Sequence, residues 1–499
     1  MNKRDSIGPD VMGEFVRRSR AAGASWVSLS VLERVERLRL LSREILARKN
    51  EIANLISAEN GKARVESVAH EIATSLANLD YLCRVAPRVL APKRQHLKWS
   101  PDRRAMLYRR PFGVVLVISP WNVPLAIPLG AVMAALIAGN SVILKPSEIT
   151  PKVGDLLFGL LRCCRLPESL VQVVQGDGVV GAGLIAAKPD KVVFTGSVSV
   201  GRKVMAAAAR HPIPVTLELG GIDAMVVRED ANLELAASAA CWGATFNGGQ
   251  VCASVERVLV HDSIVDPFSE LLADKLARIT KSADLGRITM TAQREVYDRH
   301  IADARERGLE FIQGGAYRDA EHLEPTLIRG AGVLDSKVYR EESFGPIVAL
   351  ASFNSDSDAI AMHNDTPFGL TASIFSQDRK KSLQMAEQLG TGLVSINEVA
   401  ATLHGHPEVP WGGIGASGFG RSHGEEGLLG NTWVQVIDEN RLPGLEFKRP
   451  WWYPYDSTQM DFVDQLTEAI GSDSRRERVK ALLRAGRSML RLSVRKPRL

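Results

Sequence analysis

The sequence predicts an α/β protein with two parallel-sheet domains and a small accessory sheet. The chain has 499 residues, and single hydrophobic cores stop growing beyond about 250–300 residues, so more than one domain is expected. Short β-branched runs alternate with apolar helical stretches from residue 113 onward, which is the pattern of βαβ units. Two polar, strand-like segments, 95–110 and 431–439, fit neither core.

The elements of the first domain follow in order. Residues 31–57 carry Leu, Ile and Val at helical spacing among charged residues and predict one or two amphipathic helices. The alternation then predicts strands at 112–118, 141–145, 170–174 and 191–194, separated by helices at 128–138, 153–164 and 180–187. Strands of a second α/β domain are predicted at 224–227, 257–261 and 347–351. Binding sites in such sheets lie at the carboxyl ends of the strands.

The composition is that of a globular protein, with 45% hydrophobic and 24% charged residues. A disordered or collagen-like chain is therefore excluded. Charge is unevenly distributed, because residues 475–499 contain ten Lys or Arg and one acidic residue, which leaves 52 basic and 56 acidic residues elsewhere. The main body is mildly acidic, and we expect no nucleic-acid partner.

The cysteines indicate a reducing compartment. There are 5 of them, and this odd number without CxxC spacing predicts neither disulfides nor a zinc site. The segment up to Arg20 lacks the apolar core of a secretory signal. The longest apolar stretch, Ala131 to Ala138, is far below the roughly 18 residues that span a bilayer. We therefore expect a cytoplasmic protein.

A GxGxxG motif occurs at Gly176–Gly181, after a predicted strand and before a predicted helix. A dinucleotide fingerprint also needs an acidic residue at the end of a strand about 20 residues later. The chain has Phe194-Thr195-Gly196-Ser197 there, so a plain Gly-rich turn is the favoured interpretation.

Three other residues are candidates for chemistry. Cys252 follows Asn247-Gly248-Gly249-Gln250-Val251, and a cysteine on a tight Gly-rich turn has backbone N–H groups beside it that suit an oxyanion. Glu218 in Leu-Glu-Leu-Gly-Gly is either a desolvated general base or a structural ion-pair partner. Asn122, between prolines after a strand, is either an oxyanion donor or a turn residue. From the residues alone, the alternatives of a buried thiol, a structural carboxylate and a turn residue stay open.

His404-Gly405-His406 and His423 are the remaining candidates. No cluster of Cys, Asp or further His accompanies them in the sequence, so we expect no metal site.

Taken together and in this order, the motifs resemble the aldehyde dehydrogenase superfamily over about residues 30–445. The matching segments are Trp121-Asn122, Lys145-Pro146-Ser147-Glu148, Phe194-Thr195-Gly196-Ser197, Glu218-Leu219-Gly220-Gly221, Gly249-Gln250-Val251-Cys252, Glu342-Ser343-Phe344-Gly345-Pro346, Asn364–Leu370, Asn397, Pro410–Gly413 and Ser417–Arg421. The resemblance implies a Rossmann-type NAD(P)-binding domain at 1–94 and 111–218, a catalytic α/β domain at 219–430 and a β oligomerisation element at 95–110 and 431–445. It leaves 446–499 as a basic C-terminal extension.

By resemblance, Cys252 is the nucleophile that attacks the aldehyde carbon, and Asn122 and the Cys252 backbone N–H hold the oxyanion. Glu218 then activates the water that hydrolyses the thioester. The family's cofactor contacts map onto Ser119, Trp121, Lys145, Ser147, Glu148, Gly196, Ser197, Glu342 and Phe344. Glu148 favours NAD, because a carboxylate binds the ribose 2′-hydroxyl and repels a 2′-phosphate. Lys145 would help to bind a phosphate, so NADP remains an alternative cofactor.

The partners implied are a small-molecule aldehyde and at least one further copy of the chain, in a homodimer or tetramer. The basic extension predicts either a peripheral contact with an anionic membrane surface or a helix on the partner subunit. In the first case a hydrophobic aldehyde becomes the expected substrate.

The residues argue against three alternatives to hydrolytic aldehyde oxidation. A CoA-acylating relative is disfavoured by Glu218, because some acylating members lack that base. A non-catalytic protein on the same fold would not need Cys252, Glu218 and Asn122 together. A cysteine hydrolase lacks a histidine placed by motif to activate Cys252.

Overall fold

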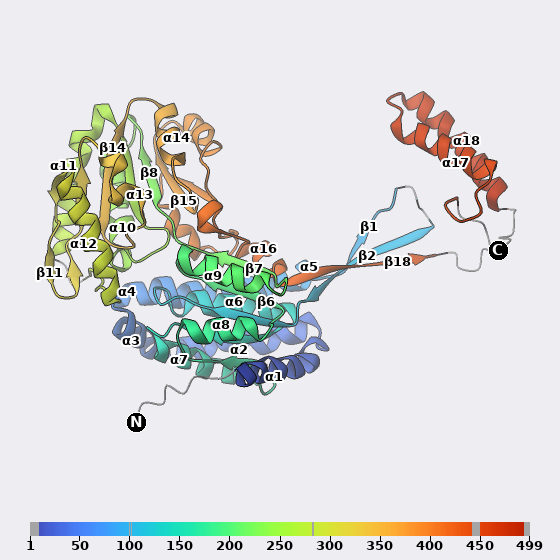
Figure 1. Ribbon diagram of the computed structural model, residues 1–499, viewed down its shortest axis with the longest axis horizontal. Coiled ribbons are helices and arrows are strands. Elements are labelled where there is room, and N and C mark those ends of the chain that lie inside the picture. Colours follow the sequence, from blue (N-terminus) through green and yellow to red (C-terminus); the bar gives the residue numbers. More distant parts are fainter. Residues whose placement is uncertain (1–8, 99, 101, 282–283, 442–449, 494–499) are drawn as a thin grey trace. The chain divides into compact units, whose positions relative to one another are not determined.

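The computed structural model describes residues 9–98, 100, 102–281, 284–441 and 450–493. It has the predicted α/β architecture (Figure 1). The described chain divides into two compact units. The larger unit contains the described residues up to Ala91 together with Arg109–Val434, and the smaller unit contains those of 92–108 and 435–499.

A six-stranded sheet, in the order β17-β7-β6-β3-β4-β5, forms one half of the larger unit. Its strands are β3 (Val114–Ile118), β4 (Ser141–Lys145), β5 (Val171–Val173), β6 (Lys191–Thr195), β7 (Val215–Glu218) and β17 (Gly418–Phe419). β3 to β7 are parallel, and β17 adds antiparallel to β7. The carboxyl ends of β3, β4, β6 and β7 therefore lie along one edge.

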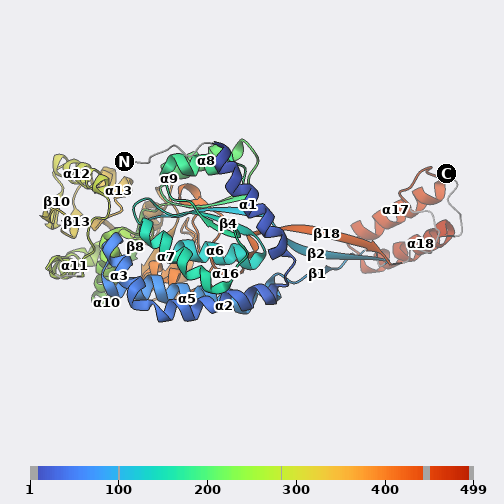
Figure 2. The same ribbon diagram turned by 90° about the horizontal axis from the view of Figure 1, so that it is seen from below.

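Helices cover both faces of this sheet (Figure 2). One face packs on α1 (Pro9–Val27), α8 (Gly178–Ala186) and α9 (Val198–Ala209). The opposite face packs on α2 (Val31–Ala47), α3 (Lys49–Asn60), α5 (Thr74–Val89), α6 (Ala126–Ala138), α7 (Pro151–Leu161) and α16 (Gly424–Leu429). α1 was not among the predicted helices, because the apolar side chains that it fully buries are few and widely spaced, namely Met12, Val16 and Trp26.

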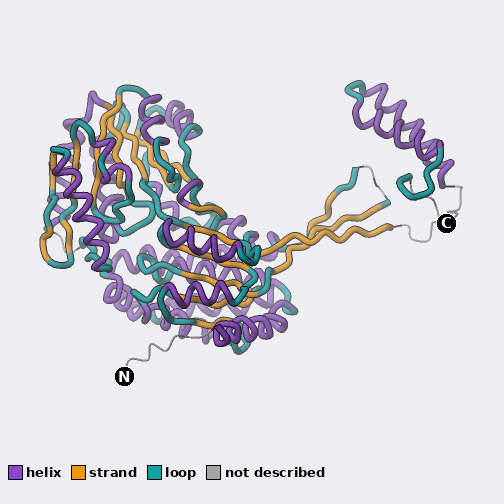
Figure 3. Tube along the Cα trace, viewed as in Figure 1, coloured by secondary structure: helices purple, strands orange, loops and turns teal. Residues whose placement is uncertain are grey.

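A seven-stranded sheet, in the order β10-β13-β14-β9-β8-β15-β16, forms the other half of the larger unit (Figure 3). Its strands are β8 (Asp223–Val227), β9 (Val255–His261), β10 (Glu310–Gln313), β13 (Thr326–Arg329), β14 (Ile347–Phe353), β15 (Thr371–Phe375) and β16 (Leu393–Ile396). One face packs on α10 (Leu233–Thr245) and α11 (Val265–Thr280). The other face packs on α12 (Thr291–Glu306), α13 (Lys337–Arg340), α14 (Asp356–Asn364) and α15 (Arg379–Ala386).

The smaller unit contains most of a three-stranded sheet and two helices. The sheet order is β1-β2-β18, from Lys93–Gln95, Arg103–Pro111 and Thr432–Asn440. The helices α17 (Ser457–Gly471) and α18 (Arg475–Ser493) are joined by an Arg484–Glu468 ion pair of 2.6 Å and a hydrogen bond from Ser488 Oγ to Gln465 Oε1 of 3.1 Å. Among the described residues, none of the helices is both long and apolar enough to cross a membrane.

Candidate active site

Cys252 follows a sharp turn between α10 and β9. Asn247, Gly248 and Gly249 have positive φ angles of 52°, 65° and 73°. A Cβ on Gly249 would lie 2.2 Å from the carbonyl carbon of Gly345, so both the φ angle and the available space require glycine there. The turn places Cys252 against a small apolar cluster around Trp411 that also contains Val251, Leu403 and Val409.

The thiol is in a desolvated site with several carboxyl groups around it. Burial, followed by the charges of Asp223, Glu218 and Glu342, raises the pKa of Cys252. A thiol in such surroundings gives up its proton less readily than an exposed one, so positive charge or a base nearby would favour the nucleophilic thiolate.

Asn122 is tied to the Cys252 turn by its side chain. Its Nδ2 donates a hydrogen bond of 3.0 Å to the backbone oxygen of Gln250, two residues before Cys252. An amide nitrogen has two hydrogens, and the second makes no hydrogen bond within the described chain. The second Nδ2 hydrogen of Asn122 is therefore a buried donor without an acceptor, next to the turn that carries Cys252. An oxyanion site requires a donor of this kind.

A buried ion pair that the sequence did not predict supports Asn122. Lys62 Nζ donates to Glu71 Oε1 at 2.6 Å, and both side chains are fully buried. Glu71 lies in a π-helical segment, Ser67–Ala73, and such segments are frequent at functional sites. No sequence motif marks either residue, because the pairing depends on a turn that only the fold brings near them.

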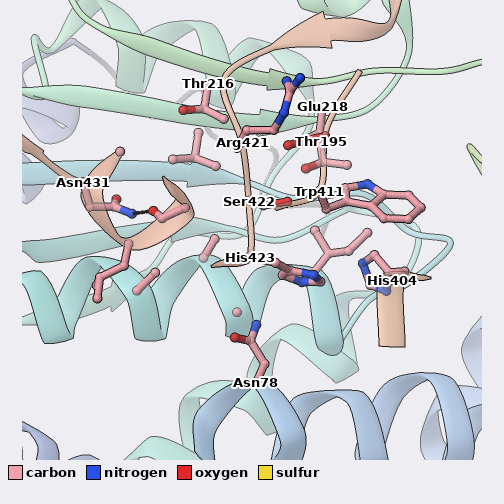
Figure 4. Close-up of a pocket in the computed structure, with 18 of the residues that line it drawn as sticks. Asn78, Thr195, Thr216, Glu218, His404, Trp411, Arg421, Ser422, His423 and Asn431 are labelled. Carbon is pink, nitrogen blue, oxygen red and sulfur yellow. Dashed lines mark hydrogen bonds between the residues drawn. The ribbon is translucent and has the colours of Figure 1, made fainter. Parts of the chain in front are cut away.

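Glu218 ends β7, at the shared edge of the six-stranded sheet. Burial raises its pKa to about 8, although Ser422 and Arg421 act in the opposite direction. Neither carboxylate oxygen has a hydrogen-bond partner of normal geometry among the described residues. Glu218 thus forms no structural ion pair within the described chain. It lines a cavity (Figure 4) that is also lined by Cys252.

Glu342 and Phe344 lie on a loop that a second buried carboxylate holds. Glu256 accepts hydrogen bonds from the backbone N–H groups of Ser343 and Phe344, at 2.7 and 2.8 Å, and Phe344 has a φ of 51°. The Glu342 carboxylate accepts the Gly221 N–H at 3.2 Å. Burial raises the pKa of Glu342 to about 8. The Phe344 ring lies edge-on to Trp121, with ring centroids 5.6 Å apart.

The other predicted cofactor residues lie at the carboxyl ends of β3, β4 and β6. Lys145 Nζ pairs with Glu148 at 2.8 Å. Ser147 Oγ accepts the Ile149 N–H at 3.3 Å. Ser119 Oγ is buried without a hydrogen-bond partner among the described residues. This unpaired hydroxyl, with a lysine and a carboxylate beside it, suits the hydroxyl and phosphate groups of a dinucleotide.

Gly196 and Ser197 lead from β6 into α9. Ser197 is the N-cap and accepts the Val200 N–H at 3.4 Å, and the N-terminus of a twelve-residue helix favours an anion. At the GxGxxG motif, in contrast, the Asp177 carboxylate itself caps α8 by accepting the Val179 N–H at 2.9 Å. Its charge already occupies that helix terminus.

The histidines outside the predicted site are close to it. His404 and His423 have ring centroids 4.8 Å apart and line the cavity that contains Glu218. Burial lowers the pKa of His423 to about 4. Within the described ranges, the structure brings together no group of three His, Cys, Asp or Glu side chains that could hold a metal ion.

Residues 6–437 match the family model described as "Aldehyde dehydrogenase family". The chain is 40% identical to 4,4'-diapolycopene aldehyde oxidase of Methylomonas, over 94% of this chain and 89% of that protein. It is 34% identical to a putative succinate-semialdehyde dehydrogenase [NADP(+)] of Mycolicibacterium smegmatis, over 88% and 86% of the two chains.

Solved structures of similar fold include the putative aldehyde dehydrogenase PutA of Anabaena variabilis. It has a TM-score of 0.84 and 33% identity, and the match covers 90% of this chain and 96% of that one. Betaine aldehyde dehydrogenase of Staphylococcus aureus in complex with NAD+ has a TM-score of 0.83 and 30% identity, with 89% and 92% covered.

Proposed function

Because the chain belongs to the aldehyde dehydrogenase family, we propose that it oxidises a lipophilic aldehyde through Cys252, Asn122 and Glu218. The protein is an NAD(P)-dependent aldehyde dehydrogenase with the fold of that family. One observation carries the assignment of these residues. Cys252 and a desolvated Glu218, whose carboxylate has no hydrogen-bond partner of normal geometry among the described residues, line the same cavity, and the Asn122 amide bonds to the Cys252 turn.

In the first step, the Cys252 thiol loses its proton to water, and the thiolate sulfur adds to the aldehyde carbon. The carbonyl oxygen becomes an oxyanion in the thiohemiacetal. The free Nδ2 hydrogen of Asn122 and the backbone N–H of Cys252 stabilise that charge, since both groups are fixed before the reaction. Hydride loss from the thiohemiacetal carbon leaves a thioester on Cys252.

The NAD(P)+ that the predicted cofactor residues would hold would supply the acceptor for that hydride. Ser119, Ser147, Gly196 and Ser197 would hold its phosphate groups, and Lys145 and Glu148 the adenosine ribose. Trp121, Glu342 and Phe344 would hold the nicotinamide end. Because Glu148 is acidic, we propose that NAD is preferred to NADP.

In the second step, Glu218 removes a proton from water, and the water oxygen attacks the thioester carbon. The C–S bond breaks, the carboxylic acid leaves, and Cys252 is regenerated. Burial has raised the pKa of Glu218 to about 8, which makes its carboxylate a stronger base than an exposed one and suits this role near neutral pH.

The proposed lipophilic substrate is supported by the apolar side chains around the thiol. Cys252 packs against Trp411, Leu403 and Val409, and a relative of 40% identity is a 4,4'-diapolycopene aldehyde oxidase. NADH formation measured with aldehydes of increasing chain length tests this. We expect kcat/KM to rise with apolar length, and equal values for acetaldehyde and a long-chain aldehyde would contradict the substrate proposal.

We further propose the functional division of the fold. Segments 1–94 and 111–218 form the NAD(P)-binding domain, 219–430 the catalytic domain, and 95–110 with 431–445 the oligomerisation sheet. The exposed apolar side chains on β18, which are Trp433, Val434, Val436 and Ile437, support a dimer or tetramer in which another copy covers them. Sedimentation as a monomer at micromolar concentration would contradict this.

The extension 446–499 is proposed to contact an anionic membrane surface. On α18, Val479, Leu483 and Leu490 are 49%, 63% and 69% exposed and share one face by their spacing. Basic residues one turn away border this stripe, namely Arg476, Lys480, Arg487 and Arg491. These four form no ion pair within the described part of the chain. An apolar stripe with a basic border matches an anionic lipid surface.

A further inference from the structure

A partly enclosed cavity extends from Glu218 along one face of the six-stranded sheet (Figure 4), and Cys252 also lines it. It is bounded by α5, α6, β6, β7 and the segment from Arg421 to Asn431. The centres of water molecules can occupy about 70 Å³ of it, and one water needs at least about 10–15 Å³ by that measure. The cavity therefore has room for several water molecules.

Several residues that line this cavity have buried polar atoms without a partner in the described chain. Both carboxylate oxygens of Glu218, Asn78 Oδ1, His423 Nδ1 and Asn431 Oδ1 are buried without a hydrogen-bond partner among the described residues. Buried polar atoms in native proteins nearly always bond to protein or to ordered water. A cavity bordered by five such atoms is consequently a place for water, whereas a purely apolar cavity stays dry.

A column of polar side chains on the sheet leads away from Glu218. Thr195 pairs with Glu218 across β6 and β7, and Val193 pairs with Thr216. Because side chains alternate along a strand, Lys191 and Thr195 share a face with Thr216 and Glu218, and all four line the cavity. Lys191 Nζ donates to Thr216 Oγ1 at 2.9 Å. Thr216 is two residues, or about 7 Å, from Glu218 along the strand.

Lys191 is unusual among the lysines that the structure describes. Its side chain is buried, it forms no ion pair with a carboxylate in the described structure, and the Phe112 ring lies 5.6 Å from its Nζ. Burial lowers its pKa to about 8. The other titratable or charged groups that line the cavity are Glu218, Cys252, Arg421, His404 and His423.

We propose that water in this cavity connects Glu218 to Lys191, and that Lys191 takes up the proton that Glu218 removes during thioester hydrolysis. The proton leaves the attacking water for the Glu218 carboxylate, passes to a cavity water, and an adjacent water gives one proton to the Lys191 amine. Thr216 orients the last water and the amine. This inference rests on the proposed role of Glu218 as base, and it makes Lys191 a proton relay that does not contact the substrate.

The test isolates hydrolysis from oxidation by using 4-nitrophenyl acetate without cofactor. Attack by Cys252 releases nitrophenolate in a fast phase, and hydrolysis of the acetyl thioester sets the slow phase. In Lys191→Met we expect the slow phase to fall about tenfold while the fast phase changes less than about twofold, since direct acid–base groups contribute about 10²–10⁴ and a relay less. Its solvent deuterium isotope effect should rise in the same variant.

Three further variants guard against a merely structural effect. Thr216→Val should slow hydrolysis and Thr216→Ser should restore it, because only the hydroxyl is needed. Lys380→Met, at an exposed position on α15, is the matched control and should leave both phases unchanged. A slow phase of wild-type rate in Lys191→Met, or an equal fall in both phases, would overturn the relay. A fast phase that is missing from the wild-type protein both without and with NAD would instead contradict the proposed nucleophile.

Discussion

Lys62 Nζ donates a hydrogen bond of 2.7 Å to the backbone oxygen of Asn122. The same ammonium pairs with Glu71 at 2.6 Å. Glu71 Oε2 accepts the backbone N–H groups of Leu125 and Ala126, at 3.0 and 2.8 Å. One buried ion pair thus holds both ends of the turn that carries the Asn122 amide.

Lys62→Met should therefore impair both stability and catalysis. The substitution leaves Glu71 buried without its cation, and breaking such a pair costs about 3–5 kcal/mol. We expect a lower urea midpoint of unfolding and a fall in kcat that exceeds any change in KM, because the oxyanion forms only during the reaction. Lys49→Met, at an exposed helix position, serves as the control, and equal midpoints for the two variants would contradict this account.

Thioester hydrolysis should increase with pH. Burial raises the pKa of Glu218 from the ordinary 4.5 to about 8, and only the deprotonated carboxylate acts as a base. The slow phase with 4-nitrophenyl acetate should rise through pH 8 and then level off, and Glu218→Gln should remove this rise. A rate independent of pH between 6 and 9 in the wild-type protein would argue against Glu218.

The same pKa shift has a consequence for stability. The folded state binds the Glu218 proton more tightly than the unfolded chain does, so the proton stabilises the fold. Stability from this group is complete below pH 4.5 and is lost as pH rises through about 8. The difference in urea midpoint between the wild type and Glu218→Gln should accordingly shift in favour of the variant as pH rises from 6 to 9.

Cofactor preference should depend on Glu148. Its carboxylate pairs with Lys145 at 2.8 Å and is 47% exposed. The exposed part of the carboxylate can therefore bind a ribose hydroxyl while the ion pair with the buried Lys145 is kept. We expect the wild type to prefer NAD. In Glu148→Ser, Lys145 is free to bind a 2′-phosphate, and the ratio of kcat/KM for NADP to that for NAD should rise at least about tenfold, or about 1.4 kcal/mol. An unchanged ratio would remove Glu148 from the proposed site.

The position of the loop that carries Glu342 and Phe344 should depend on Glu256. Glu256→Ala removes the acceptor for two backbone N–H groups and leaves them buried without a partner, at about 1–3 kcal/mol each. Since Glu342 and Phe344 are proposed to hold the nicotinamide end, KM for NAD should rise more than KM for the aldehyde. Glu306→Ala, at the exposed end of α12, should change neither. A selective rise in the aldehyde KM would contradict the assignment.

Liposome co-sedimentation tests the α18 surface. The wild type should bind vesicles that contain anionic lipid and not purely zwitterionic ones. The triple variant of Lys480, Arg487 and Arg491 to Gln should lose this binding, whereas Gln at Arg379, Lys380 and Lys381 on α15 removes the same charge and should not. Unaltered binding of the first variant, or a changed oligomeric state without lipid binding, would favour a subunit contact for α18.

The sequence could predict the fold class because the strands of the first sheet are short, apolar and separated by clear helices. It was less informative for the second sheet, where β10, β13, β15 and β16 were not predicted. These strands are four or five residues long, and polar residues such as Glu310, Arg329 and Ser373 interrupt their apolar pattern. Their pairing depends on contacts distant in the sequence, which local patterns do not contain.

The residues of the candidate site also fall into two groups, those that the sequence could predict and those that it could not. Cys252, Glu218 and Asn122 lie in sequence motifs, because their turns need glycine or proline nearby. Lys62, Glu71, Glu256 and Lys191 act through contacts that only the fold creates, so no spacing marks them. The GxGxxG segment is the opposite case, a motif without the site that it usually marks. The Asp177 carboxylate caps the helix terminus that a phosphate would otherwise approach.

Rapid mixing of the protein with NAD and an aldehyde tests the central claim most directly. We expect the wild type to form NADH continuously and Cys252→Ala to form none. Glu218→Gln should form about one NADH per subunit in the first turnover and then nearly stop, because its thioester is not hydrolysed. Continuous NADH formation by Glu218→Gln at the wild-type rate, or any turnover by Cys252→Ala, would contradict the proposed mechanism.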